Sequence, residues 1–274
     1  MTNMILCGCG GRMGEAVSKL LGNRTDIKIV AGVDIDASSV AAASGYPVYQ
    51  SVVEFPGKAD VIVDFSHHSA LPSLIEYAKK TATPIVVCTT GHTQEEIALM
   101  KSAAKEIGVF FSGNMSIGIN LVIELCKRAA NALGDSFDIE IIEKHHNKKL
   151  DAPSGTALMI ANAISDELDN NRCTPEHTNT KYVYDRHSER RQRTKDEIGI
   201  HSVRGGTIVG EHEVIFAGNN EVVTISHSAT SREVFAEGAV RAALFMHKKT
   251  EGFYNMSDVI HERLIAVLSD LGLN

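Results

Sequence analysis

Two adjacent histidines are followed by two adjacent lysines, Lys148 and Lys149, in the middle of the chain, beside a loop that opens a predicted helix. The segment runs from Ile139 to Ala157 and reads I-E-I-I-E-K-H-H-N-K-K-L-D-A-P-S-G-T-A. Imidazole and ammonium groups can donate protons, and backbone N–H groups at a helix start bind carboxylates well. The pattern predicts proton donors beside an anion site, and so an anionic substrate that carries carboxylates. The alternative is a solvated polar turn in which Ser154 acts only as a helix cap.

A glycine-rich loop near the N-terminus connects a predicted strand directly to a predicted helix. Its glycines have the spacing Gly8-x-x-Gly11-x-x-Gly14, a variant of the best-known G-x-G-x-x-G pattern. Such a loop lets the backbone approach a pyrophosphate at the start of a helix. Asp34 ends the next predicted strand, where an acidic side chain can bind the adenosine ribose. These features predict dinucleotide binding, the alternative being a plain strand-to-helix turn with Asp34 capping a strand.

The residues leave the choice between NADH and NADPH open. The carboxylate of Asp34 disfavours a 2'-phosphate by charge repulsion, whereas Arg12 in the same loop can offset that repulsion. We therefore expect NADH, NADPH or both as the cofactor.

The central segment also carries a longer motif, E-x-H-H-x-x-K-x-D-A-P-S-G-T-A, from Glu143 to Ala157. In this motif the chain resembles the 4-hydroxy-tetrahydrodipicolinate reductase (dihydrodipicolinate reductase) family. The resemblance extends over nearly the whole chain, because further family motifs follow in the same order. They are residues 8–14, 88–91, 112–118, 197–206 and 209–212.

The resemblance implies roles for individual residues. His145 is the implied proton donor or acceptor, Lys149 a proton donor and His146 a substrate contact, while Gly155 and Thr156 hold a substrate carboxylate through their backbone. The implied cofactor-binding residues belong to three loops and one strand end. They are Gly8, Cys9, Gly10, Gly11, Arg12, Met13, Asp34, Cys88, Thr89, Thr90, Ser112, Gly113, Asn114 and Met115.

The family's reaction is the reduction of 4-hydroxy-tetrahydrodipicolinate to tetrahydrodipicolinate with loss of water, in lysine and diaminopimelate biosynthesis. One rival is another NAD(P)-dependent amino-acid dehydrogenase with the same two-domain plan, whose substrate would carry one carboxylate. A second rival is a non-catalytic protein that senses NAD(H). The histidine and lysine segment argues against the first rival, whereas a biological effect that His145→Ala leaves intact would indicate the second. The resemblance also implies a homotetramer, built through the sheet of the second domain.

The order of predicted elements indicates an α/β protein with two domains. Residues 1–115 alternate short apolar strands with helices, which is typical of a Rossmann-like, doubly wound parallel sheet. Helices in about 229–274 are expected to complete this dinucleotide-binding domain. Residues 116–228 form the predicted domain for substrate binding and oligomerisation. Its successive strands, near 198–203, 207–209, 213–216 and 222–226, indicate an α+β domain with a mixed or antiparallel sheet.

Several other features are given structural roles. Thr93 and Glu96 are expected to form a capping box at the start of a helix over 94–107. The basic run Arg186–Lys195 is expected to be an exposed, mobile loop. Polar residues near strand ends are expected to satisfy backbone groups or an oligomer interface rather than to do chemistry. They are His201, Arg204, His212 and Arg232.

Composition limits the partners and the compartment. The chain has 274 residues, 43% of them apolar, and a formal net charge of -7. This charge argues against nucleic acid or an anionic membrane surface as the main partner and favours a small-molecule substrate, which the resemblance specifies as a small dicarboxylate. Five scattered cysteines, with no C-x-x-C pair, indicate reduced thiols in a cytoplasmic protein. No metal is expected, because the adjacent histidines have no H-E-x-x-H pattern or cysteine partner.

Overall fold

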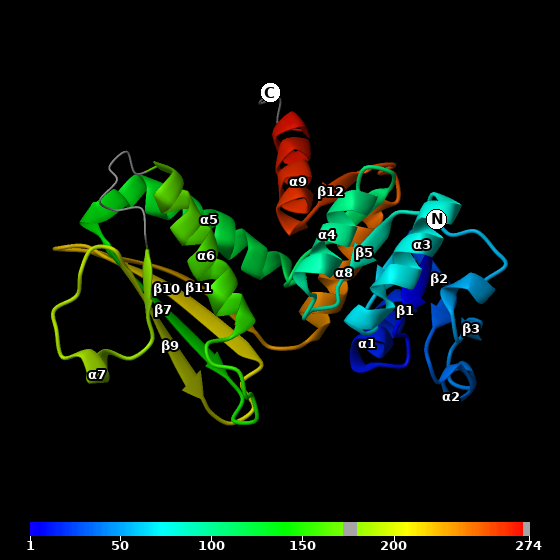
Figure 1. Cartoon of the computed structure of the whole chain (residues 1–274), viewed down its shortest axis with the longest axis horizontal. Helices are drawn as coiled ribbons and strands as arrows, with labels where there is room; N and C mark the ends of the chain where they lie inside the picture. The colour runs from blue at the N-terminus through cyan, green and yellow to red at the C-terminus, as the bar shows by residue number, and fades with distance from the viewer. Residues whose placement is uncertain (172–179, 271–274) are drawn as a thin grey trace. The chain divides into compact units, whose positions relative to one another are not determined.

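The computed structural model describes residues 1–171 and 180–270, which form two compact units. Unit 1 comprises residues 1–117 and 232–274, of which 271–274 lie outside the described residues, and unit 2 comprises residues 118–231. Figure 1 shows the helices and strands of each unit. The functional roles that the sequence suggests for the two domains stay predictions.

Unit 1 contains a seven-stranded, all-parallel sheet in the order β12-β6-β5-β4-β1-β2-β3. The strands are β1 (Thr2–Cys7), β2 (Ile27–Val33), β3 (Val48–Tyr49), β4 (Val61–Asp64), β5 (Ile85–Val87), β6 (Gly108–Phe111) and β12 (Gly252–Tyr254). The Rossmann-like fold is therefore confirmed, with β3 and β12 as additional short edge strands.

Side chains of β1 alternate between two cores, as the period of a strand requires. Met4 and Leu6 face the core formed with α1 (Arg12–Leu21) and α8 (Glu233–Met246). Ile5 and Cys7 face the core formed with α3 (Leu71–Thr81) and α4 (Gln94–Ala103). Helices thus cover both faces of the sheet, and the parallel strands are buried on both sides.

The remaining short elements of unit 1 are α2 (Ala37–Ala41), η1 (Val52–Glu54) and η2 (His68–Ala70). The predicted capping box of α4 is confirmed: Glu96 N donates to Thr93 Oγ1 and Thr93 N donates to the Glu96 carboxylate. Helix α4 ends at Ala103, four residues before the predicted end. Helix α9 (Met256–Asp270) follows β12.

Unit 2 contains a five-stranded mixed sheet in the order β11-β10-β7-β9-β8. Its strands are β7 (Asp138–His145), β8 (Lys181–Val183), β9 (Glu197–Arg204), β10 (Gly210–Ala217) and β11 (Val222–Ala229). β10 pairs antiparallel with β7 and β11, whereas β7 and β8 pair parallel with β9. Helices α5 (Ile117–Leu133) and α6 (Gly155–Asn171) pack on one face of this sheet, where Ile119, Ile160 and Ile141 share one core (Figure 1).

One prediction about unit 2 is wrong and a second is right only in part. Residues 207–209 form no strand, because β10 begins only at Gly210 after a turn at residues 206–207. The basic run is exposed at most of its residues, as predicted, but it starts with the short helix α7 (Arg186–Glu189) and its arginines bind carboxylates of the sheet. Arg186 and Arg193 both bind Glu140, and Arg191 binds Glu197, whose side chain is fully buried.

Candidate active site

The glycine loop of unit 1 lies at the carboxyl end of β1 and borders a cavity of about 520 Å³. Gly8, Gly10, Gly11 and Asp34 are the predicted cofactor residues that line this cavity. Gly8 has φ +72°, and a Cβ there would lie 2.5 Å from the carbonyl oxygen of Phe65. Only glycine fits this position without strain, because its φ is unfavourable for L side chains and its space is already filled.

Asp34 follows β2 at the same edge of the sheet. Its Oδ2 accepts a hydrogen bond from Gly10 N at 2.9 Å, and its Oδ1 accepts one from Asp36 N at 3.1 Å. The carboxylate therefore fixes the glycine loop against the end of β2 and also borders the cavity. The predicted hydrogen bonds from this carboxylate to a ribose stay a prediction.

The other predicted cofactor residues lie elsewhere in unit 1. Arg12 and Met13 begin α1. Cys88 to Thr90 follow β5 and Ser112 to Met115 follow β6, at the carboxyl edge but outside the lining of the cavity. Cys88 and Met115 are buried members of the core.

Asp64 is a functional candidate that the sequence reasoning did not identify. It is fully buried at the end of β4, and its carboxylate accepts hydrogen bonds from Ser66 N at 2.9 Å and Thr89 Oγ1 at 2.9 Å. It thereby ties the loop after β4 to the loop after β5. The sequence could have indicated this residue, because Asp64 is an acidic residue at the end of a predicted apolar strand.

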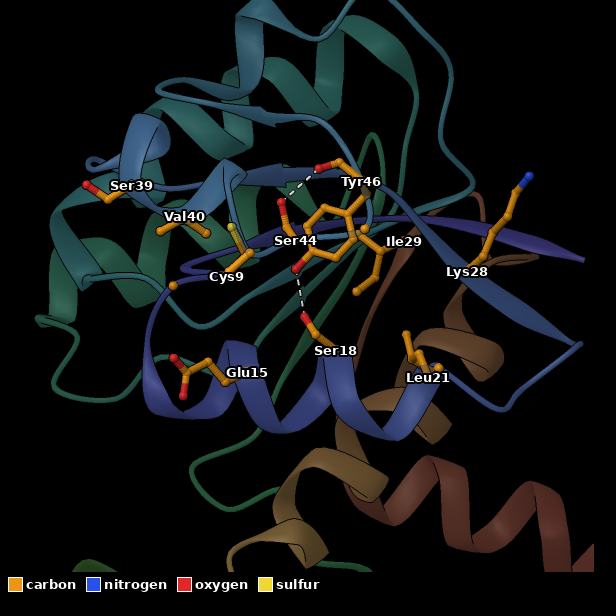
Figure 2. Close-up of a pocket in the computed structure, with 14 residues that line it drawn as sticks. Cys9, Glu15, Ser18, Leu21, Lys28, Ile29, Ser39, Val40, Ser44 and Tyr46 are labelled. Atoms are coloured by element: carbon orange, nitrogen blue, oxygen red, sulfur yellow. Dashed lines mark hydrogen bonds between the residues drawn. The ribbon is translucent and has the colours of Figure 1, made fainter.

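A second cavity, of about 710 Å³, shares Gly10 with the first and is lined by residues of α1 such as Glu15, Ser18 and Leu21. Figure 2 shows Ser18 and Tyr46 in this cavity, with their hydroxyl oxygens 2.6 Å apart, and Glu15 at the start of α1. Cys9 also lines it, and burial, followed by the charge of Asp34, raises the pKa of that thiol to about 11. Cys9 is thus a neutral thiol at physiological pH. Cys173 lies outside the described residues.

In unit 2, His145 ends β7 with its side chain directed toward the helix-covered face of the sheet. Its Nδ1 lies 2.6 Å from Oε2 of Glu143, which is 0% exposed. Arg204, opposite His145 on β9, donates to both oxygens of Glu143 at 2.8 and 2.7 Å, and Ser154 N donates to Oε1 at 3.1 Å. Burial alone would raise the pKa of Glu143, but hydrogen bonds from Arg204 and His145 lower it to about 2.

His212 of β10 completes this cluster. Its ring lies 5.3 Å from the ring of His145 at an angle of 75°, and its Nε2 is 3.1 Å from Ser154 Oγ. Burial, followed by the nearby His145, lowers the pKa of His212 to about 4. This imidazole is therefore neutral at physiological pH.

The sequence predicted structural roles for Arg204 and His212, but both residues lie in this cluster. Arg204 and His212 surround Glu143 and His145, whereas His201 pairs with Glu140 at 2.7 Å on the opposite face of the sheet. The sequence contained a signal, because Arg204 and His212 belong to family motifs, but the strand pairing was needed to bring them together.

The loop after β7 leads from His145 to the first turn of α6. Ser154 caps this helix, since its Oγ accepts a hydrogen bond from Ala157 N at 3.1 Å. No atom lies within 4 Å of where a Cβ on Gly155 would be, so space is open beside the helix start. Lys149 Nζ lies 2.8 Å from Asp151 Oδ1, and the buried Nδ1 of His146 has no hydrogen-bond partner among the described residues. The cluster therefore offers imidazole and ammonium groups beside a helix N-terminus.

Two negative findings apply to the part of the chain that the structure describes. No group of three or more His, Cys, Asp or Glu side chains there is placed to hold a metal ion. None of the described helices has the length and apolar character that a membrane crossing needs.

Comparison with known proteins gives a consistent result. The family model for the N-terminal part of dihydrodipicolinate reductase matches residues 2–115, and that for the C-terminal part matches residues 118–260. The 4-hydroxy-tetrahydrodipicolinate reductase of Caldanaerobacter subterraneus is 50% identical over 260 residues, 95% of this chain and 98% of the relative. The same enzyme of Clostridium tetani is 46% identical over 261 residues, again 95% and 98%.

A solved structure supports the fold. The dipicolinate-bound dihydrodipicolinate reductase of Paenisporosarcina sp. TG-14 matches with a TM-score of 0.74 and 24% identity, over 94% of this chain and 99% of that chain. The sequence matches go further than the fold, because they cover both units at high identity. The chain belongs to the dihydrodipicolinate reductase family, and it is an NAD(P)H-dependent oxidoreductase.

Proposed function

We propose that this chain catalyses the NAD(P)H-dependent reduction of 4-hydroxy-tetrahydrodipicolinate to tetrahydrodipicolinate, with release of water, in lysine and diaminopimelate biosynthesis. The observation that carries the proposal is the cluster at the end of β7. It places His145, with a buried carboxylate at its Nδ1, near the capped first turn of α6. Family membership supplies the reaction, and the cluster supplies groups that suit it.

The substrate is a small dicarboxylate, the class to which the ligand in the related solved structure belongs. Gly155 and Thr156 hold one carboxylate through the N–H groups of the first turn of α6, where a helix favours negative charge. His146 and Lys149 add donors on the same loop. The imidazole and ammonium groups favour a doubly charged anion over a substrate with one carboxylate, as for an amino-acid dehydrogenase.

His145 and Lys149 control the proton in this proposal. The hydroxyl group of the substrate leaves with a ring proton as water, which gives a conjugated imine. Adding hydride to this imine builds electron density that an acid must neutralise. His145 protonates the resulting enamine, and Lys149 supplies a second proton donor. When bound, the nicotinamide cofactor supplies the hydride.

The cofactor-binding residues of unit 1 are those predicted from the family motifs. Gly8 to Met13 form the phosphate loop, and Asp34 accepts hydrogen bonds from the ribose. Cys88 to Thr90 and Ser112 to Met115 line the nicotinamide end, at the carboxyl edge where α/β sheets bind ligands.

NADH is the preferred cofactor in this proposal. The lining of the cavity beside Asp34 includes no lysine or arginine in the described part of the chain. Arg12 begins α1 and does not line this cavity, so a 2'-phosphate would meet the carboxylate with no cation in the lining to balance it. We expect a KM for NADPH on the order of tenfold above that for NADH, which corresponds to about 1.4 kcal/mol. Asp34→Ala should narrow this ratio, and a wild-type preference for NADPH would contradict the assignment.

The resemblance further supports a homotetramer and a cytoplasmic location. The face of the unit 2 sheet opposite α5 and α6 carries Ile142 and Ile215, together with the exposed Val203. Apolar side chains on a face without a helix are typical of an assembly surface.

The first experiment measures oxidation of NADH and NADPH with freshly generated 4-hydroxy-tetrahydrodipicolinate. Because general acid catalysis contributes about 10²- to 10⁴-fold, His145→Ala and Lys149→Ala should each lower kcat by about 100-fold or more. Lys148→Ala is the matched control, since this neighbouring lysine is exposed, and it should stay within about threefold of wild type. A folded wild-type protein that binds NADH but does not oxidise it with this substrate would refute the proposal.

A further inference from the structure

Glu143 is a buried carboxylate whose two oxygens receive hydrogen bonds from Arg204, His145 and Ser154. Arg204 Nη1 and His145 Nδ1 approach Oε2 at 2.8 and 2.6 Å. Arg204 Nη2 and Ser154 N donate to Oε1 at 2.7 and 3.1 Å. Such a fully satisfied buried group keeps one position and one charge state.

These contacts fix the position of the proton on His145. A carboxylate can only accept hydrogen bonds, so Nδ1 of His145 must carry the hydrogen in the bond to Oε2. The other ring nitrogen, Nε2, is then the one that can exchange a proton. The imidazole is held in one orientation with Nε2 directed away from Glu143.

Gly210 keeps the space beside Nε2 open. A Cβ on this residue would lie 3.1 Å from Nε2 of His145. Gly210 begins β10, next to the strand that ends in His145. A side chain at this position would therefore contact the nitrogen that exchanges the proton.

Arg204 links this arrangement to the rest of the loop. Besides Glu143, its Nη2 donates to the carbonyl oxygen of Asp151 at 2.6 Å. Gly205 N, the next residue, donates to the carbonyl oxygen of His145 at 2.9 Å. The guanidinium thus fixes Glu143 and the loop that carries Lys149 in one hydrogen-bond network.

We propose that Glu143, held by Arg204, is the positioning residue of His145: it keeps the hydrogen on Nδ1 and leaves Nε2 to deliver the proton into the space beside Gly210. This inference rests on the proposed function of His145. It assigns to Glu143 an indirect role, because the carboxylate has no access to substrate.

The opposite face of the same strand provides a matched control. Glu140 binds His201 Nε2 at 2.7 Å and the Nε of Arg193 at 3.1 Å, so it also joins an imidazole to a guanidinium. Its side chain lies three residues before Glu143 on β7. Replacing Glu140 removes the same chemical group without disturbing His145.

The test compares Glu143→Gln with Glu140→Gln in the full-length protein. An amide cannot satisfy all of the donors around Glu143, because its NH₂ group would face either Arg204 and Ser154 or Arg204 and His145. We expect Glu143→Gln to lower kcat by about 10- to 100-fold, because His145 would lose part of its effect as a general acid. The KM values for substrate and NADH should stay within about threefold of wild type. Glu140→Gln should leave kcat within about twofold of wild type.

The outcomes distinguish this inference from the proposed function. Wild-type activity that is lost in His145→Ala upholds the proposed function, and Glu143→Gln then tests only the positioning role. A folded Glu143→Gln protein with wild-type kcat, or with only a raised KM, would overturn the inference. An equal loss of kcat in Glu140→Gln would also overturn it, because a general effect on the sheet would then explain both.

A second pair of variants tests the direction of Nε2 even if Glu143→Gln does not fold. Gly210→Ala places a methyl group against Nε2, whereas Gly45→Ala, in unit 1, adds a methyl group where a Cβ would have no neighbour within 4 Å. We expect Gly210→Ala to lower kcat by about tenfold or more, and Gly45→Ala to stay near wild type. Equal kcat values in these two variants would show that Nε2 does not act at this position.

Discussion

At the scale of single residues, burial decides the charge of His212. Its side chain is 4% exposed, and burial, followed by the neighbouring His145, lowers the pKa to about 4 from the ordinary 6.5. Above pH 6.5 this group is neutral in both the folded and the unfolded chain. Between about 6.5 and 4 only the unfolded chain takes up the proton, so the free energy of unfolding falls as the pH falls.

This difference predicts an acid-sensitive stability. The contribution of His212 should decrease by about 2 kcal/mol between pH 7 and pH 5, because one pKa unit corresponds to about 1.4 kcal/mol. His212→Gln lacks the titrating group, so its loss of stability over this range should be smaller than that of wild type. Denaturant unfolding of both proteins at pH 7 and pH 5 measures this change in the free energy of unfolding. Parallel losses in the two proteins would refute the assigned shift.

Glu143 has its own effect at lower pH. Its folded-state pKa of about 2 lies below the ordinary 4.5, so its contribution to stability is present above pH 4.5 and disappears as the pH falls toward 2. The two groups therefore act in successive windows, His212 first and Glu143 second.

At the scale of elements, the turn between β1 and α1 depends on Gly8. Gly8→Ala places a Cβ 2.5 Å from the carbonyl oxygen of Phe65 at a φ of +72°. We expect a loss of stability of about 1–3 kcal/mol and a clear decrease in NADH affinity, measured by thermal unfolding and by NADH fluorescence titration.

Gly45→Ala is the control for this change. No atom lies within 4 Å of its Cβ position, so the substitution should leave both quantities near wild type. An unchanged NADH affinity in Gly8→Ala would show that the loop is not the phosphate site.

Local patterns predicted most of these elements. The apolar runs of unit 1 gave strands such as Ile27–Val33, and the Thr93 and Glu96 pair gave the start of α4, because both signals depend on neighbouring residues. The error at residues 207–209 has a local origin too, since a short run of β-branched residues also fits a turn.

Contacts between distant residues could not be read from the sequence. Arg204 meets Glu143 only because β9 pairs with β7 in one register, and His212 joins them from β10. Arg186 and Arg193 of the basic run likewise bind Glu140, which lies far away in the sequence on β7. The many charged residues of this run predicted an exposed loop, because the composition of a segment does not show which carboxylates of the sheet will lie beside it.

At the scale of the whole molecule, the face of the unit 2 sheet opposite α5 and α6 predicts assembly. Ile215 lies on this face of β10, whereas its neighbours Val214 and Phe216 are buried in the core under α5 and α6. If the proposed tetramer forms through this face, Ile215→Lys should shift the protein toward smaller species in sedimentation velocity. The physical reason is that a charge in an apolar interface is costly unless it is paired.

Val53→Lys is the control, because Val53 is an exposed apolar residue of unit 1. It should sediment like wild type. A wild-type protein that is monomeric at micromolar concentration, or an Ile215→Lys protein that remains tetrameric, would contradict the assembly proposal.

The path of the chain through the two units has a consequence for synthesis. Unit 2 is continuous from residue 118 to 231, whereas unit 1 needs residues from both ends of the chain. Its core on the α1 side includes Ala236, Ala239 and Val240 of α8 packed with Met4 and Leu6. A nascent chain that has just left the ribosome up to residue 231 can complete unit 2 but not unit 1. During this interval the apolar side of β1 has no α8 to cover it, and such transiently exposed apolar surface is prone to aggregation.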